Sequence, residues 1–403
     1  MEQFPVGHHE LGSIEDLKEQ LRLFRECSTD NEFLKANQQH LETLLSHTLN
    51  TDATFHEAVE TLLAVAPFVH KQDDQSPWQR LTWDALVGAL NLKDGGLQAQ
   101  VLTVFSHFQM VEGNHRAARQ SIENARERAL EQNNEVALLL AYIRFFEFFV
   151  FEPRDITPAD VVQPVLQLAA RVNKPRLSTQ LHYALAHFYN QWGDAERALG
   201  HGEVAYALAR YHGDKDNLAR AAYLMVTICR LRYLRVAKHF LQVALTTDFS
   251  SLPAHDKMTS LMHTSAMYYE MGKFEEAAAG YSAALKLTER LKRPYYRASC
   301  FQGLALAQIR LKRFDDARVN LYRAGKIWAK RGNPYDLANH RFTQGYLEGW
   351  AGNRDIALEL LDEAVMLCDD IPSMASRDAL RKQILDTRQQ IVDGTLEDFY
   401  RIT

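Results

Sequence analysis

Pairs of alanines recur along this chain with a period of about forty residues, and this repeat constrains the fold more than any other feature. The first alanine of each pair recurs at intervals of 80, 39, 40, 40 and 40 residues. The second follows seven residues after the first in every copy. Because 80 is twice 40, one further copy is expected inside the first interval. The pairs are Ala118 and Ala125, Ala198 and Ala205, Ala237 and Ala244, Ala277 and Ala284, Ala317 and Ala324, and Ala357 and Ala364.

A larger apolar residue stands four residues after the first alanine in five of the six copies. Spacings of four and three residues place it and both alanines on one face of a helix. The small residues let this face approach a neighbouring helix closely, and the larger one fills the space beside them. The exception is Gly202, and the larger residues are Ile122, Leu241, Tyr281, Leu321 and Leu361.

A glycine precedes this helix in four copies and supplies a tight turn from the helix before it. Apolar residues at helical spacing lie upstream of the turn, so each copy contains two helices. A repeat of this length is typical of stacked helical hairpins. The turn pairs are Gly113-Asn114, Gly193-Asp194, Gly272-Lys273 and Gly352-Asn353.

The copy at residues 265–284 resembles the tetratricopeptide repeat (TPR) family almost position for position. Its period exceeds the thirty-four residues usual in that family and is similar to the long repeats of bacterial regulators. The resemblance implies an all-α fold, a right-handed α-α superhelix of about seven to eight helical hairpins. The matching residues are Ser265, Tyr268, Gly272, Phe274, Ala277, Tyr281 and Ala284.

We expect three regions: a helical capping region at 1–95, the repeat array at 96–370, and a C-terminal capping helix with a tail at 371–403. The missing copy should occupy about 135–172, where prolines exclude a standard hairpin corner. Its phenylalanine-rich first helix belongs either to a divergent repeat or to a hinge or partner-binding irregularity with exposed aromatics. In the capping region, apolar spacing predicts helices at 31–48, 54–71 and 77–92.

Composition supports long helices with short connections, because the 403 residues include only 19 glycines and 11 prolines. The net charge of −5 and the pI near 6.4 give no global reason to expect nucleic-acid or membrane binding. The four cysteines lie far apart, which predicts free thiols in place of a zinc site or disulfides. The sequence has no signal-peptide pattern and no apolar run near the ~20 residues of a membrane span, so we expect a cytoplasmic protein.

The sequence contains no phosphate loop, dinucleotide fingerprint, metalloprotease motif or nucleophile elbow. Its sixteen histidines are scattered. His182 and His187 are five residues apart, a poor helical spacing for sharing one metal ion. We therefore expect no enzyme activity, no catalytic residues, no cofactor and no metal site.

In the TPR family the first helix of each hairpin lines a concave groove, so the resemblance implies a partner-binding surface there. The implied side chains are aromatic and aliphatic with a few polar groups, which suits an apolar peptide or an amphipathic helix. They lack the lysine and asparagine set that captures C-terminal carboxylates in some members. A shifted helix register would instead pack some of them between repeats. The implied groove residues are Tyr183, His187, Asn190, Arg230, Met262, Tyr269, Gln302, Arg310, Phe342 and Tyr346, with Ala222, Val226 and Cys229 at the same positions of the second copy.

Charge is unevenly distributed along the chain. Residues 286–331 carry thirteen Lys or Arg against three acidic residues, a local charge of +10. Residues 1–75 carry fourteen acids against five bases, and residues 347–403 twelve against six. A basic repeat between acidic ends favours an acidic protein partner. A solvated face, attraction to an acidic end of another copy, and single-stranded nucleic acid are the alternatives. The basic patch is represented by Lys292, Arg293, Arg297, Lys312 and Arg313.

Together these features predict a non-catalytic adaptor or scaffold that binds a peptide or protein segment through the concave TPR surface and the basic repeat. Its mechanism would need only a preformed surface whose rigidity limits the entropy lost on binding. The alternative is a regulatory protein that senses a peptide or small ligand through a change in solenoid curvature. Self-association is a further expectation, and membrane binding is not expected.

Overall fold

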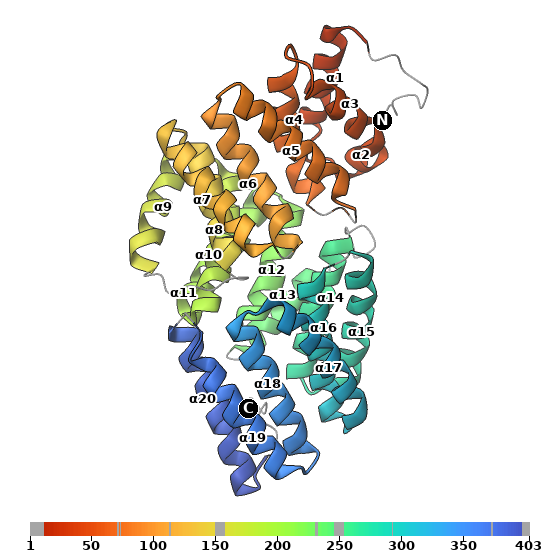
Figure 1. The fold of residues 1–403 in the computed structure, drawn as a ribbon, viewed down its shortest axis with the longest axis vertical. Helices are drawn as coiled ribbons and strands as arrows, with labels where there is room; N and C mark the ends of the chain where they lie inside the picture. Colours follow the sequence, from red (N-terminus) through yellow and green to blue (C-terminus); the bar gives the residue numbers. More distant parts are fainter. Residues whose placement is uncertain are drawn as a thin grey trace. The chain divides into compact units, whose positions relative to one another are not determined.

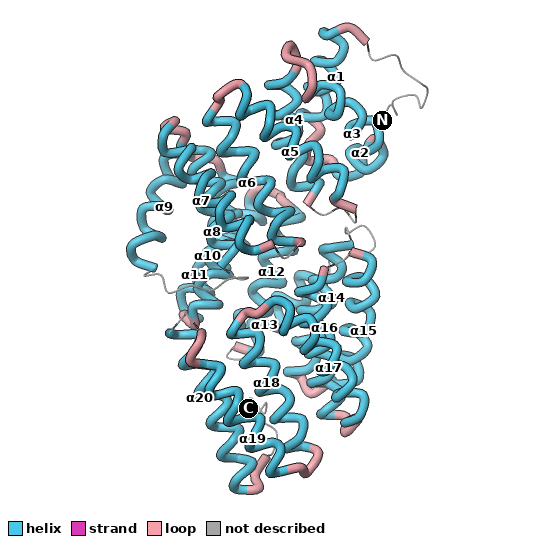
Figure 2. Tube along the Cα trace, in the orientation of Figure 1, coloured by secondary structure: helices cyan, strands magenta, loops and turns pink. Residues whose placement is uncertain are grey.

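The computed structural model of the chain describes residues 12–70, 72, 74–112, 114–149, 158–229, 233–245, 254–291, 293–371 and 374–396. In these segments all regular structure is helical, and successive helices pack as antiparallel hairpins (Figures 1 and 2). This confirms the predicted all-α, TPR-like repeat architecture. Contacts divide the chain into two compact units, one at 1–145 and the other at 146–403.

The N-terminal unit gathers its helices around a single apolar core, in which Trp78 and Phe24 are fully buried. Its first helix, α1, begins at a capping box made by Ser13 and Asp16 and was not assigned from the sequence. The helix expected at 31–48 is interrupted at Asn37 and forms two helices. The helices of this unit are α1 (Ile14–Glu26), α2 (Asn31–Ala36), α3 (Gln38–Thr48), α4 (Phe55–Val69), α5 (Ser76–Asn91), α6 (Gly95–Val111) and α7 (His115–Glu131), and α8 (Glu135–Phe149) reaches the boundary.

The C-terminal unit is built in two layers. Helices α10, α12, α14, α16 and α18 contact one another in that order and form an inner layer. Helices α11, α13, α15, α17 and α19 each pair with the inner helix before them and form an outer layer. The helices are α9 (Pro158–Val172), α10 (Pro175–Trp192), α11 (Ala195–Tyr211), α12 (Lys215–Cys229), α13 (Leu234–Leu245), α14 (Ala254–Glu270), α15 (Phe274–Arg290), α16 (Pro294–Arg310), α17 (Phe314–Arg331), α18 (Pro334–Trp350), α19 (Arg354–Cys368) and α20 (Met374–Asp393).

The paired alanines are all buried, as the repeat predicts. All twelve have an exposed fraction of 0%. The larger residues between them are also buried, from Leu361 at 0% to Tyr281 at 8%. The alanine repeat therefore identifies the second helix of each hairpin and the face that it buries.

Gly202, the exception in the pattern, is explained by its neighbour in the next helix. A Cβ atom added to Gly202 would lie 2.4 Å from Sδ of Met225, so the large side chain now comes from α12. In a later repeat the sizes are reversed, because Tyr281 of α15 lies against Gly303 of α16. At both of these close approaches one large residue meets one small residue, whichever helix supplies which.

The predicted turns adopt the left-handed conformation that favours glycine. Gly193, Gly272 and Gly352 have φ values of 91°, 73° and 86°. Lys312 takes the same place between α16 and α17 with φ 58°. The fourth predicted turn glycine, Gly113, lies outside the described residues.

Two helices, α8 and α9, occupy the place of the missing copy, and the corner between them at 150–157 lies outside the described residues. Phe146 and Phe148 of the phenylalanine-rich segment are buried, with exposed fractions of 0% and 2%. The Phe146 ring lies edge-on to Phe188 of α10, with 5.2 Å between their centroids. These two aromatics therefore belong to the core and leave no exposed surface for a partner.

The last helix, α20, covers the apolar faces of α18 and α19. It buries Leu380, Ile384 and Ile391 in one cluster with residues of those helices. The start of α20 also contacts the end of α10, where the Ser376 hydroxyl donates to the Gln191 carbonyl oxygen. A helix near the C-terminus is thus tied to the first hairpin of this unit, 185 residues away.

Candidate functional site

The predicted groove residues do not form one surface. Tyr183, His187, Asn190 and Met262 are half-buried on the inner layer, as is Arg310, whereas Tyr269, Gln302, Phe342 and Tyr346 are buried. Arg230 lies outside the described residues. Several of them meet in two clusters, one formed by α10, α12, α14 and α16 and the other by α14, α16 and α18.

The first cluster begins with Tyr183 and His187 on α10. Their rings meet edge-on with 4.8 Å between centroids. The Arg220 guanidinium of α12 lies over the Tyr183 ring, 4.6 Å from its centroid, a cation–π contact. All three side chains are half-buried.

The cluster continues through α12 to α14 and α16. His263 stacks on the Tyr223 ring at 6.2 Å, and its Nδ1 lies 2.8 Å from the Thr227 hydroxyl. Tyr296 of α16 is half-buried and interacts electrostatically with Tyr183 and Arg220. We call Tyr183, His187, Arg220, Tyr223, Thr227, His263 and Tyr296 the tyrosine–histidine cluster.

Burial shifts the pKa values of three members of this cluster toward their uncharged forms, those of His187, Tyr223 and Tyr296. Burial, together with the nearby His263 and Arg220, lowers the pKa of His187 to about 3. Burial raises the pKa of Tyr296 to about 12; Tyr183 and Glu147 add to the shift, while Arg293 and Arg220 oppose it. At neutral pH the imidazole of His187 is therefore uncharged beside a guanidinium.

The sequence identified Tyr183 and His187 but missed the rest of this cluster, because the register of the next copies was misplaced. Ala222, Val226 and Cys229, the positions expected to face a groove, have exposed fractions of 0% and pack in the core. Met262 packs with an apolar cluster, while its neighbour His263 joins the polar one. A shift of one residue turns a helix by 100°, which is enough to exchange a surface position for a core position.

The second cluster joins Tyr269 of α14, Arg310 of α16 and Tyr346 of α18. The Arg310 guanidinium lies 4.5 Å from the Phe274 ring centroid and 5.1 Å from that of Trp350. Burial raises the pKa of Tyr346, and Arg310, Trp350 and Tyr269 oppose the shift. Arg310 is thus held between aromatic rings, an arrangement that stabilises the packing of these repeats.

Gln302 and Phe342 have structural roles. The Gln302 amide donates to the Thr343 hydroxyl at 3.0 Å and accepts from the Trp328 indole at 3.1 Å. Phe342 packs in the apolar cluster covered by α20. Both side chains face neighbouring helices, so they offer no surface to a partner.

The predicted basic patch is partly neutralised by acids of adjacent repeats. Arg293 is buried, and Lys292 lies outside the described residues. Arg297 pairs with Glu289 at 2.9 Å and Arg313 with Glu275 at 2.8 Å. Lys312 is exposed in its turn. The local charge of +10 counted along the sequence is therefore an overestimate of the charge on the folded surface.

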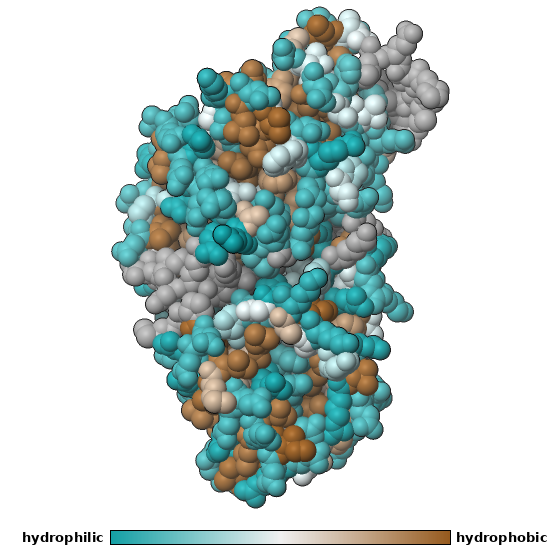
Figure 3. Space-filling view, in the orientation of Figure 1, coloured by the Kyte–Doolittle hydropathy of each residue, from teal (hydrophilic) through white to brown (hydrophobic). Residues whose placement is uncertain are grey.

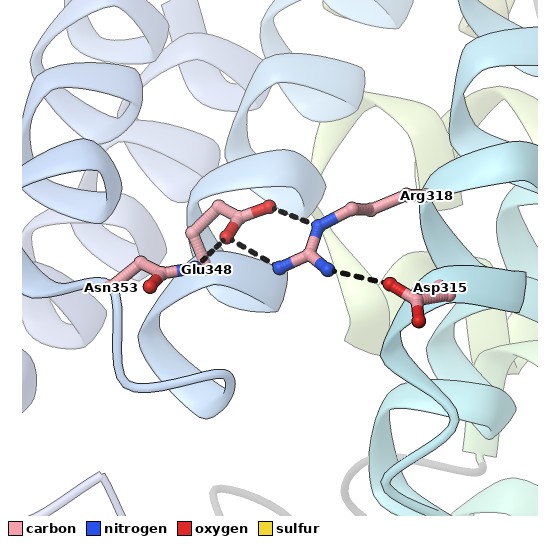
Figure 4. A network of polar contacts seen from close by, with 4 residues as sticks. All are labelled: Asp315, Arg318, Glu348 and Asn353. Atoms are coloured by element: carbon pink, nitrogen blue, oxygen red, sulfur yellow. Dashed lines mark hydrogen bonds and ion pairs between the residues drawn. The ribbon is translucent and has the colours of Figure 1, made fainter.

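Arg318 shows how this neutralisation links two hairpins. It donates two hydrogen bonds, both of 2.9 Å, to the Glu348 carboxylate of α18 and a third of 3.0 Å to Asp315 (Figure 4). The Asn353 amide donates to the same Glu348 carboxylate at 2.6 Å. These bonds lower the pKa of Glu348. The paired-fork geometry fixes α18 against α17.

A further pair, Arg331 with Asp336, is nearly buried at the turn from α17 to α18. Its N–O distance is 3.3 Å, and the guanidinium also lies 4.6 Å from the Tyr295 ring centroid. Burial raises the pKa of Asp336 to about 6, and Arg331 opposes the shift. This arginine therefore also belongs to the packing between repeats.

Most of what remains of the basic surface lies on one face of α17, with Lys286 and Lys312 exposed outside it. Arg323, Lys326 and Lys330 are exposed, and no carboxylate pairs with them in the part of the chain that the structure describes. Tyr322 and Val319, exposed by 63% and 49%, lie beside them at helical spacing. We call these five residues the α17 face. On the face drawn in Figure 3, apolar side chains reach the surface in separate patches among hydrophilic ones.

The histidines do not form a metal site within the described segments, where no three His, Cys, Asp or Glu side chains are grouped to hold an ion. His182 pairs with His201 of α11, with 2.9 Å between their Nδ1 atoms, and not with His187. Burial, with His201 beside it, lowers the pKa of His182 to about 4. None of the helices that can be described is long and apolar enough to cross a membrane.

No family model matches the chain, and no curated protein matches it in sequence. Solved structures with a similar fold include a Rap protein complexed with competence and sporulation factor, at 12% identity over 94% of this chain and 99% of that chain, with a TM-score of 0.49. Others are the Cut9–Hcn1 hetero-tetramer of APC/C (12%, 93% and 87%, TM-score 0.32) and the TPR domain of P58(IPK) (14%, 95% and 99%, TM-score 0.25). At sequence identities and TM-scores this low, the similarity concerns the helical repeats alone. The helical hairpins described above make the chain a TPR-like repeat protein.

Proposed function

We propose that the chain is a non-catalytic adaptor that binds an acidic segment of a partner protein on the α17 face. The observation that carries this proposal is the exposure of Tyr322 among three lysine and arginine side chains. An exposed aromatic ring beside cations is the composition enriched at the energetic centres of protein interfaces. The cations complement an acidic partner and steer its approach.

The neighbouring arginines support the choice of α17, because acids of this chain pair with them and reduce their contribution to the surface charge. Arg313, Arg318 and Arg331 are engaged by acids of this chain. The positive charge left for a partner is therefore concentrated on α17. A rigid array of packed hairpins loses little conformational entropy on binding there.

Reversal of Lys326 and Lys330 to glutamate is expected to weaken partner binding about tenfold or more, since two favourable charge contacts become repulsive. The partner is first captured from a nuclease-treated lysate of the source cell, then purified and titrated against the wild-type chain and the variant. The matched control reverses Arg235 and Lys238, which are exposed on another outer-layer helix, α13. Equal loss in the control, or no loss in the α17 variant, would contradict the proposal. Capture that requires intact nucleic acid would favour the nucleic-acid alternative.

A second candidate function, ligand sensing, is favoured by the contact between α10 and α20. Ser376 and Gln191 join the two ends of a run of packed hairpins. Any ligand that changes the curvature of this run must strain or release that contact.

Sensing therefore predicts a change in distance between α11 and α20 when the ligand binds. Spin labels at Glu196→Cys and Ala379→Cys, both exposed positions, report this distance. Cys27→Ser removes the one cysteine that is not buried. A shift in the distance distribution on adding the low-molecular-mass fraction of the cell extract would support sensing. An unchanged distance distribution, together with stable partner binding, would contradict sensing and leave the adaptor as the remaining function.

A further inference from the structure

The outer face of α19 resembles the α17 face in composition but carries the opposite charge. Two apolar side chains, Ile356 and Met366, are exposed on it by 52% and 65% and lie at helical spacing. Asp355 and Glu359 are exposed beside them, and Asp370 is exposed in the turn that follows the helix. We call these five residues the α19 face. Like the α17 face, it combines two exposed apolar side chains with three charges of one sign.

In the described part of the chain, the three acids of the α19 face form no ion pair. Three neighbouring acids do, with arginines of α18 and α20. These pairs are Asp362 with Arg388, Glu363 with Arg341, and Asp369 with Arg381. The unpaired negative charge of this outer-layer helix is therefore concentrated on the α19 face, as the unpaired positive charge of its neighbour is on the α17 face.

The two helices are successive members of the outer layer, because α18 packs against both α17 and α19. The forty-residue period makes Lys330 and Asp370 equivalent positions, and likewise Val319 and Glu359. At the buried positions of the same helices the period repeats alanine without change. The two repeats therefore share their packing residues and differ in charge on their outer faces.

This difference in charge is not a general property of the outer layer. On α11, for example, Glu196 and Glu203 are exposed together with Arg197 and Arg210, so both signs of charge are mixed. A mixed face has no preference for a basic or an acidic surface. The α17 and α19 faces do, and each repels a second copy of itself because like charges would meet.

We propose that the α17 face of one copy of the chain binds the α19 face of a second copy, which gives a twofold-symmetric dimer. A twofold axis between the two helices exchanges them, so the basic face meets the acidic face twice in one dimer. The apolar side chains of both faces, Val319 and Tyr322 on one and Ile356 and Met366 on the other, leave water when the faces meet. Charge complementarity and apolar burial thus favour the same arrangement.

The dimer regulates the α17 face, and in this respect it rests on the proposed function of that face as a binding surface. A second copy occupies the face when no acidic partner is present. The partner and the α19 face then compete for the same lysines, so dimer formation lowers the apparent affinity for the partner. Dilution or added salt weakens the dimer, because mass action and screening both oppose association.

The first test follows the purified full chain by sedimentation equilibrium, without a partner. We expect a species of twice the 46.2 kDa mass of one chain, in a concentration-dependent equilibrium with the monomer. Combining Glu359→Lys with Asp370→Lys should weaken this dimer about tenfold or more, since attractive contacts become repulsive. The matched control combines Glu196→Lys with Glu203→Lys, which reverses two exposed acids of another outer-layer helix, α11, and should dimerise as the wild type does.

A charge exchange between the two faces gives the decisive result. Lys326→Glu with Lys330→Glu, the α17 variant described above, should also lose the dimer. Mixed with the Glu359→Lys and Asp370→Lys variant, it should form a mixed dimer, because an acidic face again meets a basic face at both contacts. Two chains damaged in their folding would not restore each other, and circular dichroism checks that both variants keep their helices.

A wild-type chain that stays monomeric, a dimer that survives both reversals, an equal loss in the α11 control, or no association in the mixture would overturn the proposal. Partner binding is measured separately. The Glu359→Lys and Asp370→Lys variant keeps the α17 face and should bind the partner at least as tightly as the wild type. Partner binding that depends on α17 in a monomeric chain would remove the dimer and leave the proposed function. A dimer with the expected charge exchange, beside partner binding unchanged by reversal of α17, would do the converse.

Discussion

Replacing Ala277 by aspartate is expected to unfold the hairpins around α15. Ala277 has an exposed fraction of 0% and packs in one cluster with Tyr269, Tyr281 and Leu304. The aspartate places a charge inside this buried apolar cluster, where it loses its hydration. We expect a loss of about 4 kcal/mol or more in the free energy of unfolding, measured by urea denaturation followed by circular dichroism.

The matched control lies two residues away on the same helix. Ala279 is exposed, so Ala279→Asp adds the same charge to water and should change stability by about 0.5 kcal/mol or less. Hydrogen exchange then locates the damage. Repeats contact mainly their neighbours, so protection should fall in α14, α15 and α16 and persist around Trp78 in the N-terminal unit. Equal stability of the two variants would refute the alanine register.

The sequence predicts the outer-layer helices well because their alanines are constrained from two sides. Ala277 must fit against both its own hairpin partner and the helix of the next repeat, so this position does not tolerate a larger residue. Such alanine positions recur in every copy, so they can be found in the sequence from their regular spacing. The turn glycines at Gly272 and Gly352 recur for a similar reason, since each needs a positive φ.

The inner-layer surface could not be predicted in the same way, because its residues share no packing constraint. Tyr183, Arg220 and His263 differ in type and do not recur at one position. The 39-residue interval before Ala237 then shifted the expected positions onto Val226 and Cys229, which are buried. Without a repeated residue type, nothing in the sequence corrects an error of one residue.

Charge counting along the sequence failed for a different reason. Arg313 pairs with Glu275 and Arg318 with Glu348, residues 38 and 30 positions away. A window of one repeat contains the cations but not these acids. Ion pairs between stacked repeats therefore make a local sequence charge a poor guide to surface charge in such arrays.

Replacing both Leu380 and Ile384 by alanine is expected to release the C-terminal end of the array. The two side chains have exposed fractions of 3% and 0% and, with Ile391, close the apolar cluster of α18 and α19. Each truncation leaves a cavity in that cluster, and together they should cost about 4 kcal/mol or more. Terminal repeats of a solenoid need such a cover, so we also expect aggregation through the uncovered face.

Leu385→Ala is the control for this prediction, because Leu385 is the next residue on α20 but is 46% exposed. It should shift stability by less than about 1 kcal/mol. Since α20 also holds α10 through Ser376, the double variant should increase the label distance between Glu196→Cys and Ala379→Cys. Destabilisation with an unchanged distance would mean that the contact between α10 and α20 survives without the apolar anchor. Unchanged stability would mean that α18 and α19 do not need their cover, and the capping role of α20 would have to be abandoned.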